Sequence, residues 1–544
     1  MRLSRRTRLG GVALLAAIGL TLSGCGGDGG DEGNGSSDST DAVITARSTE
    51  PQNPLVPQAT NEVGGGNVID LLYAGLITYK EDGSQELEVA ESITSDDNKT
   101  WTIKLKDWKF SDGTAVTAKS FVDAWNYGAG PGGKNAQNAS YFYYPIEGTT
   151  AEGTLDKNAQ TISGLKVVDD KTFTITLKQP ESDFPLRLGY SAYYPLPESA
   201  FADIKAYGEK PVGNGPYKLE AWENNKEIRL VPNGEYDGAR KAQNGGVTFV
   251  VYTDTEAAYT DLQSGNLDVL DTVPDSALAT FADDSAIQPI EAPGSVNGSF
   301  QFPVDLPGFT GEAGKLRRQA VSMALNREEL TEKLFFGTRT PALDFSAPPM
   351  PGWTDEIPGN EVLEFNADEA KKRWAEAEKI EPWGNKKLLI ATNTDGAGNK
   401  ASVDAMANQI KNTLGINAEP KYYATFDEFL DDRDNNKTGA LFRAGWQPDY
   451  PSISNYLGPI YGTGAASNDA RWSNKEFDAL IAKAAGAEND EDRYQAFVDA
   501  QAILMEELPG LSMWYTDATG AAAKGVKNVK FNWQGVPIYQ NITK

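Results

Sequence analysis

The stretch Trp101-Thr102-Ile103-Lys104-Leu105-Lys106 has apolar residues at every second position. This alternation is typical of a strand that is buried on one face only. The same pattern returns in Phe173-Thr174-Ile175-Thr176-Leu177. Helical spacing of apolar residues appears instead across residues 316–324 and again across 494–508. The sequence therefore predicts a mixed α/β fold.

A helix is also predicted directly after Thr117. The run that follows places Phe121, Ala124 and Trp125 on one helical face. A threonine hydroxyl can accept a hydrogen bond from the first turn of a helix, so we expect Thr117 to be the N-cap.

Length and composition limit what the chain can do. With 544 residues, it is about three times the usual domain size, so two or more lobes are expected. A net charge of −27 disfavours nucleic acid as a partner, because both would be anionic. The absence of histidine removes the usual general base and the commonest zinc ligand. We expect no enzymatic activity, no cofactor and no metal site.

The amino terminus has the pattern of a lipoprotein signal peptide. Residues 1–8 are basic, residues 9–24 are uncharged and mostly apolar, and Leu22-Ser23-Gly24-Cys25 forms a lipobox. The apolar run is too short to span a membrane. Cys25 is the only cysteine and is expected to carry the lipid, which would hold the exported protein on the outer face of the cytoplasmic membrane. The arginines at the start leave both Sec and Tat export open.

A flexible linker is expected after the lipidated cysteine, over residues 25–41. Its sequence is rich in Gly, Ser and Asp, a composition that cannot bury a core.

Six segments together resemble the extracellular solute-binding proteins of family 5, the substrate-binding lipoproteins of oligopeptide and dipeptide ABC transporters. They follow one another in order over about 370 residues, and the resemblance covers nearly all of the chain after the linker. The segments are FSDGTAVTAKSFVDAW (110–125), VGNGPYKL (212–219), LQSGNLDVLD (262–271), LRRQAVSMALNREEL (316–330), RAGWQPDYPS (443–452) and WSNKEFDALI (472–481).

The resemblance implies a large two-lobed periplasmic-binding-protein-like fold of class II, with an extra domain inserted in the first lobe. On this pattern lobe I would combine residues 42–88, 212–303 and 510–544. The inserted domain would be 89–211, and lobe II would be 304–509. A ligand would be enclosed when the lobes close on it.

The resemblance also implies a binding site for the three parts of a free peptide. The α-ammonium needs a partly buried carboxylate, and Asp449 matches the family's Asp after a Gly-Trp segment. The alternative for Asp449 is an ordinary turn residue before Tyr450 and Pro451. The peptide backbone would pair as an added strand with Gly445, Trp446 and Gln447 and with a first-lobe segment that contains Val63, Gly64 and Gly65.

Arg443 matches an arginine that meets the carboxylate of short ligands in relatives, and a guanidinium fork suits that group. An internal salt bridge is the alternative. Tyr141 and Phe426 match aromatic pocket positions, although aromatics in such runs are commonly plain core. Where a relative has a histidine near the far end of the ligand, this sequence has Asn399.

The expected function is capture of short peptides in an extended conformation and their delivery to the permease subunits of an ABC importer, by a protein that acts as a monomer. An alternative within the same fold is a non-peptide solute, such as a siderophore-like compound, a metal complex or a sugar. A sensing role without transport stays open. A secreted carbohydrate hydrolase with two carboxylates is the enzymatic alternative, but no spacing of acidic residues singles out a pair.

Overall fold

The two alternating stretches form neighbouring strands in the computed structural model, which describes residues 41–394, 398–465 and 467–544. Strand β5 (Thr100–Leu105) pairs antiparallel with β7 (Thr172–Thr176), and Ile103 lies opposite Phe173. Both side chains are fully buried. The predicted strands are thus confirmed, each with one face on a core.

These strands belong to a small antiparallel sheet with the order β4-β5-β7-β6, in which β4 is Ala90–Thr94 and β6 is Leu165–Asp169. A second small sheet pairs β2 (Ile77–Tyr79) with β3 (Gln85–Leu87).

The main sheet has eleven strands within the described residues. Its order is β15-β14-β16-β12-β17-β11-β1-β10-β9-β8, and β13 pairs with β17 beside this path. The strands are β1 (Val43–Ser48), β8 (Tyr217–Glu223), β9 (Glu227–Pro232), β10 (Gly246–Val251), β11 (Val269–Leu270), β12 (Ile287–Gln301), β13 (Arg339–Pro341), β14 (Leu388–Asn393), β15 (Ala418–Tyr423), β16 (Leu441–Trp446) and β17 (Gly510–Ala523).

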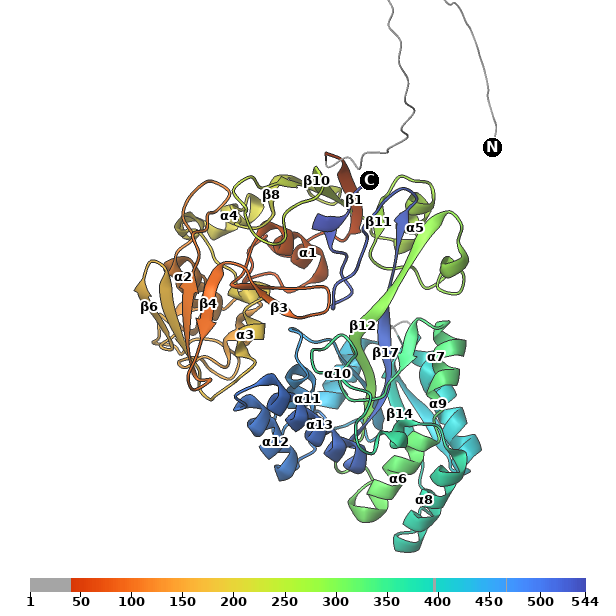
Figure 1. Ribbon diagram of the computed structural model, residues 1–544. Helices are drawn as coiled ribbons and strands as arrows, with labels where there is room; N and C mark the ends of the chain where they lie inside the picture. The colour runs from red at the N-terminus through yellow and green to blue at the C-terminus, as the bar shows by residue number, and fades with distance from the viewer. Residues whose placement is uncertain (1–40, 395–397, 466) are drawn as a thin grey trace, which may run out of the picture. The chain divides into compact units, whose positions relative to one another are not determined.

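Two long strands, β12 and β17, run antiparallel through the middle of this sheet (Figure 1). Their register is interrupted by a bulge between Ala292 and Val296. One end of the pair adjoins β11, and the other end lies beside β16. The pair therefore connects both halves of the sheet.

The predicted helices are confirmed. Residues 316–324 lie in α6 and its C-cap, residues 494–508 lie in α13 and its C-cap, and Thr117 is the N-cap of α2. The α-helices are α1 (Val63–Leu72), α2 (Ala118–Ala129), α3 (Phe184–Arg187), α4 (Ile204–Glu209), α5 (Thr255–Gln263), α6 (Gly311–Met323), α7 (Arg327–Phe335), α8 (Ala367–Ile380), α9 (Asn399–Leu414), α10 (Phe426–Asp434), α11 (Ser454–Tyr461), α12 (Lys475–Ala485) and α13 (Asp490–Glu507).

Two large clusters of buried apolar residues form the core. The first takes its residues from 44–287 and 521–542, and the second from 300–515 together with Trp533. Strands β12 and β17, called the crossing strands below, each contribute residues to both clusters. The small sheet of β4 to β7 shares the first cluster with β1 and β10. The lobe borders given above stay a prediction.

No helix within the described residues is long and apolar enough to cross a membrane. The signal peptide, Cys25 and nearly all of the predicted linker lie outside the described residues.

Candidate functional site

A cavity of about 340 Å³ brings together segments that are far apart in the sequence. They include the chain around the start of α1, the loop after α3, the loop after β16 and the stretch before the carboxyl terminus, together with Tyr141 and Arg240. The lining residues used below are Glu62, Val63, Asp70, Tyr141, Tyr190, Tyr194, Arg240, Gln447, Pro448, Asp449 and those between 532 and 540.

Asp449 reaches the cavity from the loop that follows β16. Its backbone N–H donates to Oδ1 of Asn455 at 2.9 Å, and Nε1 of Trp446 donates to the same oxygen at 3.0 Å. Asn455 thereby fixes the loop on both sides of Pro448. Burial raises the pKa of Asp449 to about 6, against the lowering effects of the Arg187 charge and of a hydrogen bond from Asn455.

Arg187, the last residue of α3, is the cation that acts on Asp449. It is already engaged, because its Nε donates to Glu181 and its Nη2 donates to the Tyr144 hydroxyl at 2.9 Å. Its guanidinium also lies 4.5 Å from the ring centroid of Tyr450. Arg187 therefore supports the loop without neutralising Asp449 by a direct ion pair.

Tyr141 lies in the cavity wall and is 41% exposed. Burial and the nearby Tyr190 and Asp449 raise the pKa of its phenol, so the hydroxyl stays protonated. Burial and the charge of Asp449 likewise raise the pKa of Tyr190 to about 12. Two neutral phenols therefore lie near the Asp449 carboxylate, and Tyr141 lines the cavity.

The expectation for Val63, Gly64 and Gly65 needs a correction. This segment is not extended; it forms the first turn of α1, with Glu62 as the N-cap that accepts from the Gly65 N–H at 2.9 Å. Val63 lines the cavity, whereas the two glycines are buried. A Cβ on Gly64 would lie 2.6 Å from the Thr49 carbonyl oxygen, so close packing requires this glycine.

Gly445, Trp446 and Gln447 lie at the end of β16 and in the loop after it. Gly445 pairs with Gly298 of β12 on one side, while β14 pairs with β16 only at Leu441 and Phe442 among the described residues. Gln447 lines the main cavity. Gly445 and Trp446 line a smaller cavity of about 80 Å³.

Arg443 and Phe426 contact each other, at 5.6 Å between the guanidinium carbon and the ring centroid. Nε of Arg443 donates to Oδ1 of Asn393 at 3.2 Å, and Nδ2 of Asn399 donates to the same atom at 3.3 Å. The structure therefore brings together Arg443, Phe426 and Asn399. None of the three is among the described residues that line the main cavity.

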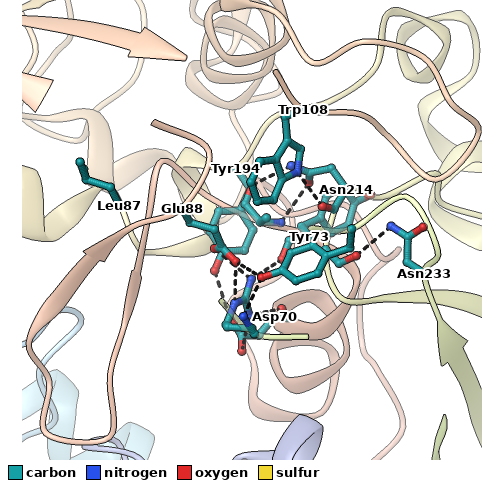
Figure 2. A network of polar contacts seen from close by, with 12 residues as sticks. Asp70, Tyr73, Leu87, Glu88, Trp108, Tyr194, Asn214 and Asn233 are labelled. Carbon is teal, nitrogen blue, oxygen red and sulfur yellow. Dashed lines mark hydrogen bonds and ion pairs between the residues drawn. The ribbon is translucent and has the colours of Figure 1, made fainter. Parts of the chain in front are cut away.

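Asp70, Tyr194 and Arg240 form a polar group in the cavity wall that the sequence reasoning missed. Asp70 of α1 lines the cavity, and Figure 2 shows it near Glu88 and Tyr194. The Tyr194 hydroxyl donates to Oδ1 of Asp70 at 3.0 Å, and Arg240 lies 3.3 Å from its Oδ2. Only the fold places these residues together, since they are 46 to 170 positions apart along the chain. Among the described residues, no group of three or more carboxylates is arranged to hold a metal ion.

Comparison with known proteins extends these observations. The chain is 27% identical over 518 residues to the oligopeptide-binding protein OppA of Bacillus subtilis (strain 168), and the match covers 91% of each chain. It is 26% identical over 459 residues to heme-binding protein A of Haemophilus influenzae, with 80% of each covered. The unliganded open form of MppA, a periplasmic murein tripeptide-binding protein, superposes with a TM-score of 0.82 at 24% identity, over 93% of this chain and 97% of that one.

Fold and relatives together define a non-enzymatic substrate-binding protein of an ABC transporter, which acts outside the cytoplasm. The chain belongs to family 5 of the bacterial extracellular solute-binding proteins, because residues 85–468 match the middle region that characterises this family.

Proposed function

We propose that this protein captures short peptides in an extended conformation between two lobes and delivers them to the membrane permease of an ABC importer. The observation that carries the proposal is Asp449, a partly buried carboxylate in the wall of a 340 Å³ cavity without a direct ion pair to Arg187. A peptide α-ammonium would supply the charged hydrogen bond that this carboxylate needs in its buried position.

The peptide backbone would lie along residues 444–449. This segment has a strand edge at one end, Asp449 at the other and a cavity against each half. A peptide added to the edge would gain main-chain hydrogen bonds that do not depend on its sequence, while its side chains enter the cavities. The expected specificity is therefore broad.

The far end of the ligand would meet Arg443, whose guanidinium suits a carboxylate. Asn393, Asn399 and Phe426 would hold Arg443 in position there. A ligand that contacts both predicted lobes would favour their closure about β12 and β17, and the importer would then recognise the closed form. The predicted lobe borders are part of this proposal.

The name of one relative raises haem as another ligand class. Haem carries two propionates, and a cavity with Glu62, Asp70 and Asp449 in its wall would repel them. A thermal unfolding screen separates the classes, because a ligand that binds only the folded protein raises the midpoint. Di- to hexapeptides should raise it, whereas haemin and sugars should not. A rise with haemin or a sugar alone would contradict the proposal.

The proposal includes membrane attachment through a lipid on Cys25 after removal of residues 1–24. The protein isolated from membranes should then begin at Cys25 and carry the added mass of acyl chains on its first residue, as mass spectrometry of the amino-terminal peptide would detect. An unmodified Cys25 in the membrane-bound protein would contradict the lipid anchor.

A further inference from the structure

The cavity wall has more anionic groups than one ligand ammonium can balance. Among the described residues that line it, Glu62, Asp70 and Asp449 are acidic, while Arg240 is the one basic residue. Glu62 is engaged at the amino terminus of α1, where its carboxylate accepts from the Gly65 N–H. The charge that remains on Asp70 therefore depends on how Arg240 divides its own charge between Asp70 and other acidic groups.

Arg240 forms a complete ion pair with Glu88, which is fully buried. Nε of Arg240 lies 2.9 Å from Oε1 of Glu88, and Nη2 lies 3.2 Å from Oε2. The Tyr236 hydroxyl donates to Glu88 as well, at 2.6 Å. This bidentate pair balances the guanidinium charge behind the cavity wall.

The remaining N–H groups of Arg240 are also occupied. Nη1 donates to the backbone oxygen of Asp70 at 2.7 Å and lies 3.3 Å from its Oδ2, and Nη2 donates to the Tyr73 oxygen at 2.8 Å. A guanidinium has five N–H donors, and these contacts with Glu88, Asp70 and Tyr73 involve five acceptor atoms. Arg240 is therefore not a site for a ligand carboxylate.

Asp70 shares the single positive charge of Arg240 with Glu88, so the three side chains carry a net charge of −1. Its side chain is 58% exposed and lines the cavity, where the Tyr194 hydroxyl fixes one carboxylate oxygen at 3.0 Å. Figure 2 shows Asp70 at the edge of the polar contacts that hold Glu88. Each carboxylate oxygen of Asp70 has one contact, Oδ1 with Tyr194 and Oδ2 with Arg240, and each can accept a further hydrogen bond.

We infer that Asp70 is a specificity-determining residue that binds a second cation of the ligand, so that the protein prefers peptides with a lysine or arginine side chain. The inference rests on the proposed function, with Asp449 taking the α-ammonium and Asp70 taking the basic side chain. A second ammonium or guanidinium would balance the charge that Arg240 leaves on Asp70.

The test compares tripeptides of alanine in which one position at a time carries lysine or its uncharged analogue norleucine. Titration calorimetry on the purified protein should give, for at least one position, a Kd about three- to tenfold lower for lysine than for norleucine. The preference should shrink when salt is raised from about 0.05 to 0.5 M, because salt screens a partly exposed pair. A preference that salt leaves unchanged would overturn the inference.

The matched variant is Asp70→Asn, which removes the charge and keeps an acceptor for Tyr194. It should lose the preference for lysine over norleucine, whatever its affinity for the norleucine peptides. Asp96→Asn, at an exposed carboxylate outside the cavity, should keep the preference. Equal binding of lysine and norleucine peptides at all positions, or a preference that survives in Asp70→Asn, would overturn the inference and leave peptide capture intact. Failure of every peptide to bind the native protein would overturn both.

Discussion

Asp449 makes ligand binding sensitive to pH near neutrality. Its pKa of about 6 lies above the ordinary value because burial favours the protonated form, whereas a ligand ammonium requires the ionised form. A peptide α-amine, with a pKa of about 8, stays protonated throughout. We expect Kd for a short peptide to rise about tenfold from pH 7 to pH 5, since most Asp449 carboxyls are protonated at the lower pH.

The raised pKa of Asp449 makes the unliganded protein more stable at low pH, whereas it weakens ligand binding there. A carboxyl whose folded pKa is raised contributes stability at low pH, and this contribution is lost as the pH rises through about 6.

Titration calorimetry between pH 5 and pH 7 checks the binding prediction, with Asp449→Asn as the control whose Kd should not change with pH. A flat profile for the native protein would contradict the role of Asp449.

At the scale of elements, the bulge in β12 is a place where the backbones of β12 and β17 approach each other closely. Gly294 lies in the bulge, and a Cβ there would be 1.7 Å from the Thr516 carbonyl oxygen of β17. Gly294→Ala should lower the free energy of unfolding by about 2–3 kcal/mol, because the strands would have to separate. Chemical denaturation measures this directly.

Gly66 provides the matched control for that substitution. It lies inside α1, and a Cβ on it would meet nothing within 4 Å. Gly66→Ala should therefore leave the stability unchanged or raise it by up to about 1 kcal/mol, since alanine favours helix. If both alanine variants behaved alike, the close approach at the bulge would not limit stability.

For the whole molecule, the sequence predicts those parts of the fold that depend on local pattern. Alternation gives β5 and β7, helical spacing gives α6 and α13, and Thr117 gives the start of α2. The first turn of α1 was missed because three consecutive glycines are poor helix formers and Glu62 is not among the preferred N-cap residues. Packing against Thr49 overrides the local preference there.

The residues of the candidate site likewise fall into those that the sequence predicts and those that only the fold brings together. Asp449 and Tyr141 could be predicted from the resemblance and do line the cavity. Asp70, Arg240 and the residues before the carboxyl terminus could not, because nothing in their local sequence marks them and only the fold brings them together. Contacts between distant segments are set by tertiary packing, which a pattern within a few residues does not encode.

The central claim is that the protein binds peptides through their free amino terminus. Titration calorimetry of the native protein with one short peptide, and with the same peptide acetylated at its amino terminus, tests this claim most directly. The account predicts binding of the free peptide and a loss of at least about tenfold in affinity on acetylation, with no such difference for Asp449→Asn. Equal affinity of the native protein for both peptides would contradict it.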